Sequence, residues 1–178
     1  MTMRMLKRTW AKYAAIAVLP VMAMLYVPIA NYSILLFGQR ALLETAPVDP
    51  TDFLRGDYVT LDYKISDITS FVRREGMSGD YDRRGRETFV SLVLDSDGVA
   101  SVAAISEERP PGLYLKGKAG RSWADSFTCD YGLGVYYVPE GTGKEIEDAI
   151  RDGDTKVFAD VRIIRGRGVI KKLEIAAR

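Results

Sequence analysis

The chain has 178 residues, with 25 Lys and Arg against 24 Asp and Glu, no His and a single Cys. This length allows one domain. The missing His residues exclude a Ser-His-Asp triad and an imidazole metal site, and one Cys excludes an intrachain disulfide or a Cys-type zinc site. Any general base would therefore be Asp, Glu, Lys or Tyr.

The N-terminal region is basic and apolar. Residues 1–40 contain five basic residues and no acid, whereas the rest of the chain is mildly acidic. No residue from Tyr13 to Gln39 is charged, and about 20 apolar residues suffice to span a bilayer. The pattern predicts a cytoplasmic basic N-terminus over residues 1–12, a transmembrane anchor over 13–38 that contacts the lipid bilayer, and an extracytoplasmic domain over 41–178.

A cleaved signal peptide and a buried core helix are the alternatives for this segment. The apolar run is longer than the 7–15 residues or so of a signal h-region. The best cleavage candidate, at Ala30, also places Pro28 at the −3 position. Both observations favour a retained anchor.

The first elements of the body follow the anchor in order. Residues 41–55 contain Pro47 and Pro50 and are expected to form an extended connector. A strand is predicted over residues 58–65, because apolar and polar side chains alternate strictly there. Residues 73–87 are charged and Gly-rich, which is typical of a surface loop.

Two hairpins and one helix are predicted further along the chain. The first hairpin joins residues 88–94 and 99–105 through the turn Asp95–Gly98, and the second joins 156–164 and 169–175. Short strands are expected over 113–117 and 135–138, a loop over 118–128, and a helix over 142–153 with a capping box. The fold class is therefore mainly β with a minor α+β character: a transmembrane helix, then a small antiparallel sheet or barrel with one short helix.

One string in the chain is specific enough to suggest a family. Residues 56–63 read GDYVTLDY, that is G-D-Y-x-x-L-x-Y, and the preceding PVDPTDFLR and the later YVPEG extend the pattern. The chain resembles the GDYXXLXY family of bacterial membrane-anchored proteins. The resemblance implies a membrane-anchored protein with no assigned activity and a multi-spanning membrane protein as partner.

The motif has a structural and a functional interpretation. Gly56 permits a turn with positive φ, Asp57 could bond to backbone amides in that turn, and Leu61 and Tyr63 share the apolar face of the strand. These roles explain the motif as scaffold. Partner binding is the alternative, and the candidate residues for either role are Arg55, Gly56, Asp57, Tyr58, Leu61 and Tyr63.

Two other clusters have simpler explanations than binding. Asp95 and Asp97 resemble the start of a calcium loop, but Gly98 comes too early and no Glu stands at the twelfth position. Basic residues near the C-terminus could contact anionic lipid but fit the solvated face of a sheet, and no nucleic acid is expected. They are Arg162, Arg165, Arg167, Lys171 and Lys172.

The leading hypothesis is a membrane-anchored accessory protein of the bacterial inner membrane. Its outer domain would lie in the periplasm and dock a larger membrane protein.

The alternative is a cell-envelope enzyme similar to signal peptidases, with Lys116 as the base. In that alignment Pro47 occupies the nucleophile position, so an active Ser–Lys dyad is not expected. No catalytic residue, metal or cofactor is assigned. A pocket with convergent polar groups would favour the enzyme, and an exposed apolar patch near the membrane would favour the accessory protein.

Overall fold

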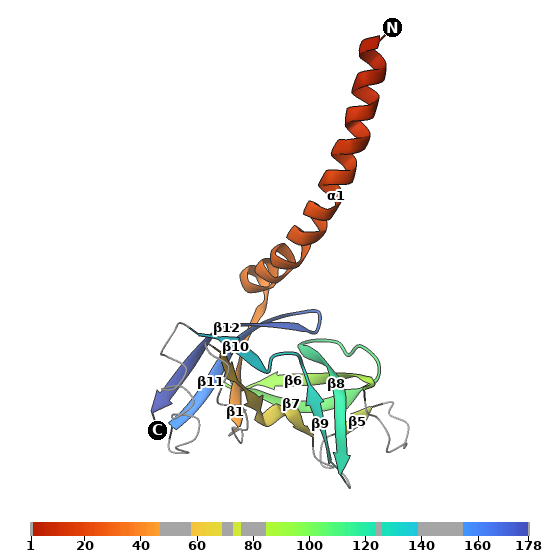
Figure 1. Ribbon diagram of the computed structural model, residues 1–178. Coiled ribbons are helices and arrows are strands. Elements are labelled where there is room, and N and C mark those ends of the chain that lie inside the picture. The colour runs from red at the N-terminus through yellow and green to blue at the C-terminus, as the bar shows by residue number, and fades with distance from the viewer. Residues whose placement is uncertain are drawn as a thin grey trace.

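The computed structural model describes residues 2–46, 58–68, 73–75, 85–123, 126–138 and 155–177. A single long helix, α1 (Thr2–Phe37), stands on a small β domain (Figure 1). The domain consists mostly of antiparallel strands, which confirms the predicted mainly β fold class. The predicted helix over 142–153 and the motif residues Arg55, Gly56 and Asp57 lie outside the described residues.

The apolar segment forms the predicted helix and passes through Pro20 and Pro28 without interruption. The stretch Ile16–Phe37 has a mean hydropathy of 1.7 and is 6% buried, and its 22 residues are enough to cross a membrane. At 1.5 Å per residue it is about 33 Å long, close to the thickness of a hydrocarbon core. The helix changes direction before it meets the β domain (Figure 1). Pro28 lacks the amide that would bond to the carbonyl of Met24, which is a common cause of such a bend.

The described strands form three sheets. One has the order β12-β11-β1-β3, the second pairs β10 with β2, and the third has the order β4-β9-β8-β6-β7-β5. The bounds are β1 (Gln39–Ala46), β2 (Tyr58–Thr60), β3 (Asp62–Tyr63), β4 (Asp67–Ile68), β5 (Arg73–Glu75), β6 (Glu87–Leu94), β7 (Ala100–Ser106), β8 (Tyr114–Trp123), β9 (Ser126–Asp130), β10 (Val135–Tyr137), β11 (Thr155–Ile164) and β12 (Arg167–Ala177).

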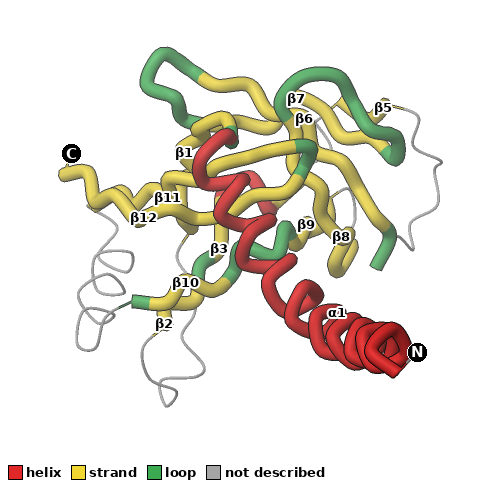
Figure 2. The backbone as a smooth tube through the Cα atoms, turned by 90° about the horizontal axis from the view of Figure 1, so that it is seen from above, coloured by secondary structure: helices red, strands yellow, loops and turns green. Residues whose placement is uncertain are grey.

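Two isolated bridges join the first and third sheets into an almost closed barrel. Leu42 bridges to Val99 beside β7, and Leu115 of β8 bridges to Gly166 at the start of β12. The ring therefore runs β11-β12-β8-β6-β7-β1 and back to β11. Seen from above, the last turns of α1 lie over the part of this ring that contains β1, β11 and β12 (Figure 2).

The core confirms the alternation predicted for residues 58–65. Val59, Leu61, Tyr63 and Ile65 are all buried, whereas Thr60, Asp62 and Lys64 are exposed. The segment is nevertheless not one strand: β2 and β3 are separated at Leu61, and the 3₁₀ helix η1 covers Lys64–Ser66. A change of hydrogen-bond partner explains the break, because β2 pairs with β10 and β3 pairs with β1.

The connector prediction for residues 41–55 is wrong over its first six residues. Residues 41–46 belong to β1, which pairs with β11 and also with β3. Ala41, Leu43 and Thr45 face the core, but the apolar Leu42 and the small Ala46 on the other face obscure the alternation. Residues 47–55 lie outside the described residues.

The loop prediction for residues 118–128 is also wrong, because β8 and β9 pair across this stretch. Gly120 inside this stretch and Gly117 just before it, a residue type that disfavours strand formation in sequence-based prediction, are needed for close packing. A Cβ at Gly117 would lie 2.5 Å from the Sγ of Cys129, and one at Gly120 would collide with the hydroxyl of Thr128. The predicted loop over 73–87 likewise starts with β5, which pairs in parallel with β7.

Both predicted hairpins are confirmed. In the first, β6 pairs with β7, and the Asp95 carboxylate accepts hydrogen bonds from the amides of Asp97 and Val99. Asp95 is therefore a turn residue, and Gly98 supplies the positive φ that the turn requires. In the second, β11 pairs with β12 along ten residue pairs.

Candidate functional site

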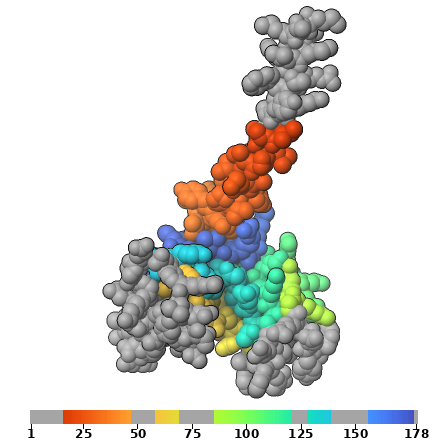
Figure 3. Space-filling view, viewed as in Figure 1, coloured from red at the N-terminus to blue at the C-terminus, as the bar shows by residue number. Residues whose placement is uncertain are grey.

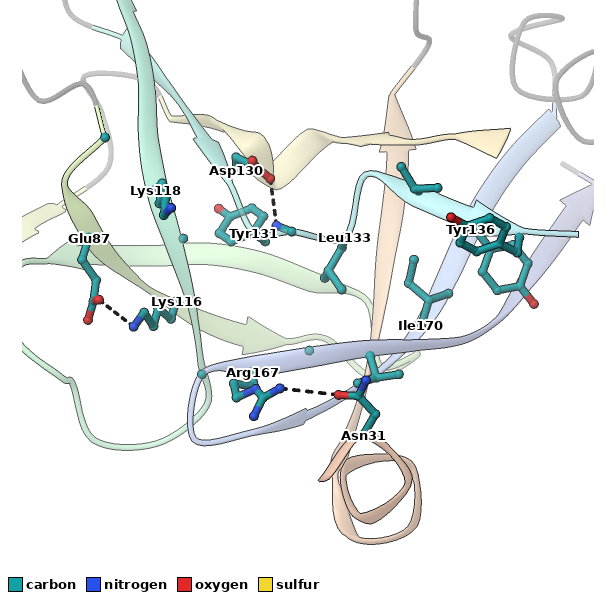
Figure 4. A pocket seen from close by; sticks show the side chains of 18 residues that line it. Asn31, Glu87, Lys116, Lys118, Asp130, Tyr131, Leu133, Tyr136, Arg167 and Ile170 are labelled. Atoms are coloured by element: carbon teal, nitrogen blue, oxygen red, sulfur yellow. Dashed lines mark hydrogen bonds and ion pairs between the residues drawn. The ribbon is translucent and has the colours of Figure 1, made fainter. Parts of the chain in front are cut away.

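A groove of about 920 Å³ opens on the side of the barrel where β8 and β12 diverge. The two strands meet at the Leu115–Gly166 bridge, where the amide of Lys116 donates to the carbonyl of Gly166 at 2.8 Å. Beyond that point the segment from Asp130 to Tyr137 fills part of the gap (Figure 4). The groove lies among Glu87, Lys116, Lys118, Asp130, Tyr131, Leu133, Val135, Tyr136, Tyr137, Arg167 and Ile170, with Asn31 of α1 at one end.

Residues 131–137, here called the groove wall, are held by the motif segment, residues 58–65. The buried hydroxyl of Tyr63 donates to the carbonyl of Leu133 at 2.8 Å, and the amide of Leu61 donates to the carbonyl of Gly134 at 2.9 Å. In the opposite direction, the Tyr131 hydroxyl donates to the carbonyl of Ile65 at 2.7 Å. Pairing of β2 with β10 continues this attachment as far as Tyr137. The motif segment therefore determines the position of the groove wall.

The six candidate motif residues fall into three groups. Leu61 and Tyr63 are core residues, in agreement with their predicted inward face. The Tyr58 side chain points away from the core and is half-buried. Its ring makes an edge-to-face contact with the ring of Tyr137, with 6.2 Å between the ring centroids. Arg55, Gly56 and Asp57 lie outside the described residues, so their roles remain predictions.

Both acids of the groove and the Tyr131 phenol already have structural partners. Glu87 pairs with Lys116 at 2.6 Å, and the Asp130 carboxylate accepts a hydrogen bond from the Gly132 amide at 2.8 Å. Burial raises the pKa of the Tyr131 hydroxyl, which keeps it protonated as the donor to Ile65. Lys116 is also ion-paired and about half exposed, unlike the desolvated lysine that acts as a base. These contacts give no support to the peptidase-like alternative.

The other nucleophile and metal candidates are equally constrained. Cys129 of β9 is buried, and desolvation raises the pKa of its thiol to about 12. The thiol therefore stays protonated at neutral pH and serves as a packing residue. Among the residues described in the structure, no group of three His, Cys, Asp or Glu side chains is close enough to hold a metal ion.

The predicted basic cluster near the C-terminus divides between several environments. The Arg162 guanidinium is partly buried, with its Nε 3.8 Å from Asp160, and Lys172 pairs with Glu174 at 3.0 Å. Arg165 is exposed in the β11–β12 turn, and Lys171 is exposed on β12. Only Arg167 lines the groove, where it faces Asn31. Of the five residues, Lys171 and Lys172 therefore fit the predicted solvated surface of a sheet, and the other three do not.

The helix joins the β domain without a linker. Gly38 alone separates α1 from β1, and a Cβ there would lie 2.8 Å from the Cβ of Arg162. Immediately afterwards, Arg40 donates to the buried carboxylate of Asp160 and to Glu174, both at 3.0 Å. Ile34 is buried in the same contact. The end of α1 therefore rests directly on the C-terminal hairpin (Figure 3), and the groove lies beside the helix end.

Sequence reasoning did not identify the groove itself. Its side chains come from α1, β6, β8, β9, β10 and β12, several of which are distant from one another in the chain. One signal was available: Tyr136 and Tyr137 are adjacent in a predicted strand, so one of them has to face outward. That residue is Tyr137, which is 77% exposed.

The comparisons with known proteins agree with the motif. The model of the GDYXXLXY protein family matches residues 20–173, which include the second half of α1 and nearly all of the β domain. No curated protein and no solved structure matches the chain significantly. Because the family model covers most of the sequence, the chain belongs to the GDYXXLXY protein family.

Proposed function

We propose that the protein is a single-pass accessory protein of the bacterial inner membrane that docks a multi-spanning membrane protein through its outer domain. The N-terminus would be cytoplasmic, because the basic residues precede the helix, and the β domain periplasmic. The observation that supports the proposal is the short junction at Gly38 and Arg40, where α1 packs directly on a β domain that has an exposed apolar surface.

That surface is the outer face of β2 and β10, formed by Tyr58, Thr60, Val135 and Tyr137 and here called the docking face. The register pairs Tyr58 with Tyr137 and Thr60 with Val135, so all four side chains point to the same side. Val135 and Tyr137 are large exposed apolar residues. Exposed aromatic residues are enriched in protein interfaces, where they contribute much contact area.

A partner in the same membrane suits this geometry. A domain joined to its anchor without a flexible linker samples few positions, so a neighbouring membrane protein meets the docking face at a high effective concentration. A small exposed face is then sufficient for binding. Confinement to one membrane already removes part of the translational and rotational entropy that a soluble complex must offset with contacts.

The topology can be tested with reporters at the C-terminus, near Ala177. A reporter that is active only outside the cytoplasm should be active there, because the positive flank retains the N-terminus inside. The full-length chain should also remain in the membrane fraction at its uncleaved mass. Activity of a cytoplasm-only reporter, or release of a shortened soluble domain, would contradict the proposed anchor.

The docking face can be tested by photocrosslinking in living cells. A photoreactive phenylalanine derivative at Tyr137 should give one discrete adduct with a membrane protein, because that side chain points outward from the docking face. The control is the same derivative at Val93, an exposed apolar residue of β6. The proposal fails if Tyr137 gives no adduct, or if both positions give the same pattern.

A further inference from the structure

The last turns of α1 run in a different direction from the turns that precede them. In the view from above, the N-terminal turns overlap one another because the helix there runs toward the viewer, whereas the last turns spread sideways over β11 and β12 (Figure 2). Pro28, a residue type that bends helices, precedes the final helical residues, 29–37, here called the lateral segment. If the turns before Pro28 cross the bilayer along its normal, the lateral segment runs at a large angle to that normal.

The lateral segment has one face on the β domain and an apolar face away from it. Ile34 is buried in the contact with the C-terminal hairpin. Ile29, Tyr32 and Leu36, here called the outer stripe, are between 57% and 62% exposed. At 3.6 residues per turn, the three side chains of the stripe lie within about 60° of one another, on the side of the helix opposite Ile34. The stripe therefore points away from the β domain.

The polar side chains of the lateral segment have partners of their own. The side-chain oxygen of Asn31 lies 3.5 Å from Nη2 of Arg167 in the β domain, and the Ser33 hydroxyl donates to the carbonyl of Ala30 at 2.7 Å. The stripe itself is apolar apart from the phenol of Tyr32, and Tyr is enriched where a bilayer meets water. No residue that the structure describes covers the stripe, since its side chains remain exposed.

We propose that the lateral segment lies in the lipid headgroup region on the side of the β domain, with the outer stripe directed at the acyl chains. The stripe faces the side from which the membrane span arrives (Figure 1). The apolar face of an interfacial helix sits about 5–10 Å into the boundary between headgroups and acyl chains. Residues 13–28 are about 24 Å long, which is enough to cross the remainder of a hydrocarbon core of about 30 Å.

The β domain is thereby held against the membrane surface, because the opposite side of the lateral segment packs on its C-terminal hairpin. Lipid is favoured over a helix of a partner protein as the cover for the stripe, since the stripe directly continues a membrane span and carries no charge. This inference rests on the membrane anchor of the proposed function. It does not depend on the docking face and holds whether or not a partner binds there.

The test measures the depth of nitroxide labels on the purified full-length chain in vesicles of phosphatidylethanolamine and phosphatidylglycerol. Labels on Ile29→Cys, Tyr32→Cys and Leu36→Cys should differ in depth by less than about 5 Å and be shielded from a water-soluble relaxant. A helix that continued along the normal would instead carry residue 36 about 10 Å farther out than residue 29. Because Cys129 is buried, the parent chain treated with the label serves as the blank.

Two further labels calibrate the depth scale. Leu19→Cys, exposed within the span, should lie near the bilayer centre, and Asp67→Cys, exposed on β4 beside β9, should be accessible to water. All five labelled positions are exposed, and near-ultraviolet circular dichroism checks that each labelled chain is folded. Any two stripe labels suffice for the comparison.

The outcomes separate this inference from the anchor itself. With the Leu19 label deep in the bilayer, a depth that decreases steadily from residue 29 to residue 36 would overturn the lateral segment and leave the anchor intact. Stripe labels as accessible to water as the Asp67 label would do the same, and would point to a protein partner as the cover. A Leu19 label accessible to water would overturn the proposed anchor and this inference with it.

Discussion

Leu61→Ala should lower the free energy of unfolding by about 2–5 kcal/mol, because it deletes a buried side chain and leaves a cavity. Leu61 is 4% exposed and packs in the main core between the positions of Val59 and Tyr63. Its amide still bonds to the carbonyl of Gly134, so the loss comes from packing alone. The measurement is the denaturant midpoint of the full-length chain in detergent, followed by circular dichroism.

Thr60→Ala is the matched control for this change. Thr60 is the adjacent residue and is exposed on the opposite face, so its truncation should change stability by no more than about 0.5 kcal/mol. If Leu61→Ala unfolds at the parent midpoint, or if both variants lose the same stability, the inward face assigned to the motif segment is wrong.

Tyr63→Phe should cost about 1–3 kcal/mol, although it removes only one oxygen atom, because a buried carbonyl loses its donor. The Tyr63 hydroxyl is the buried donor to the carbonyl of Leu133 in the groove wall. Burial and the nearby Asp62 raise the pKa of this hydroxyl, so it remains protonated and able to donate at neutral pH. The same denaturant series measures the loss.

Tyr58→Phe provides the comparison, since it makes the same chemical change in the other tyrosine of the motif. Tyr58 contacts Tyr137 through its ring, which phenylalanine retains. The free energy of unfolding of the Tyr58→Phe variant should therefore match that of the parent chain. A loss in Tyr58→Phe as large as that in Tyr63→Phe would show that the two hydroxyls do not differ as the structure indicates.

Much of the fold could be predicted from local patterns. The apolar helix, both hairpins and the alternation over residues 58–65 depend on side chains close together in sequence. The failures have a common physical origin. Strand β1 and the β8–β9 pair are stabilised by distant partners, and Gly117 and Gly120 are required by close contacts with β9 that no local pattern reveals.

The candidate site was predictable only in part for the same reason. The motif identified Leu61 and Tyr63 correctly as core residues, because their alternation encodes burial. It could not show that Tyr63 reaches Leu133, seventy residues later, or that Arg167 meets Asn31 of the helix. Those contacts exist because the barrel closes at the Leu115–Gly166 bridge, which is a property of the tertiary fold.

The central claim is that the motif segment holds the groove wall in place beside the membrane anchor. Hydrogen exchange of the full-length chain in nanodiscs tests it most directly, with Tyr63→Phe compared against Tyr58→Phe. In Tyr63→Phe the amides of residues 131–137 should exchange about 5- to 160-fold faster, corresponding to the loss of about 1–3 kcal/mol, while those of the β11–β12 hairpin stay unchanged. Unchanged exchange in the groove wall, or equal acceleration throughout the β domain, would contradict the claim.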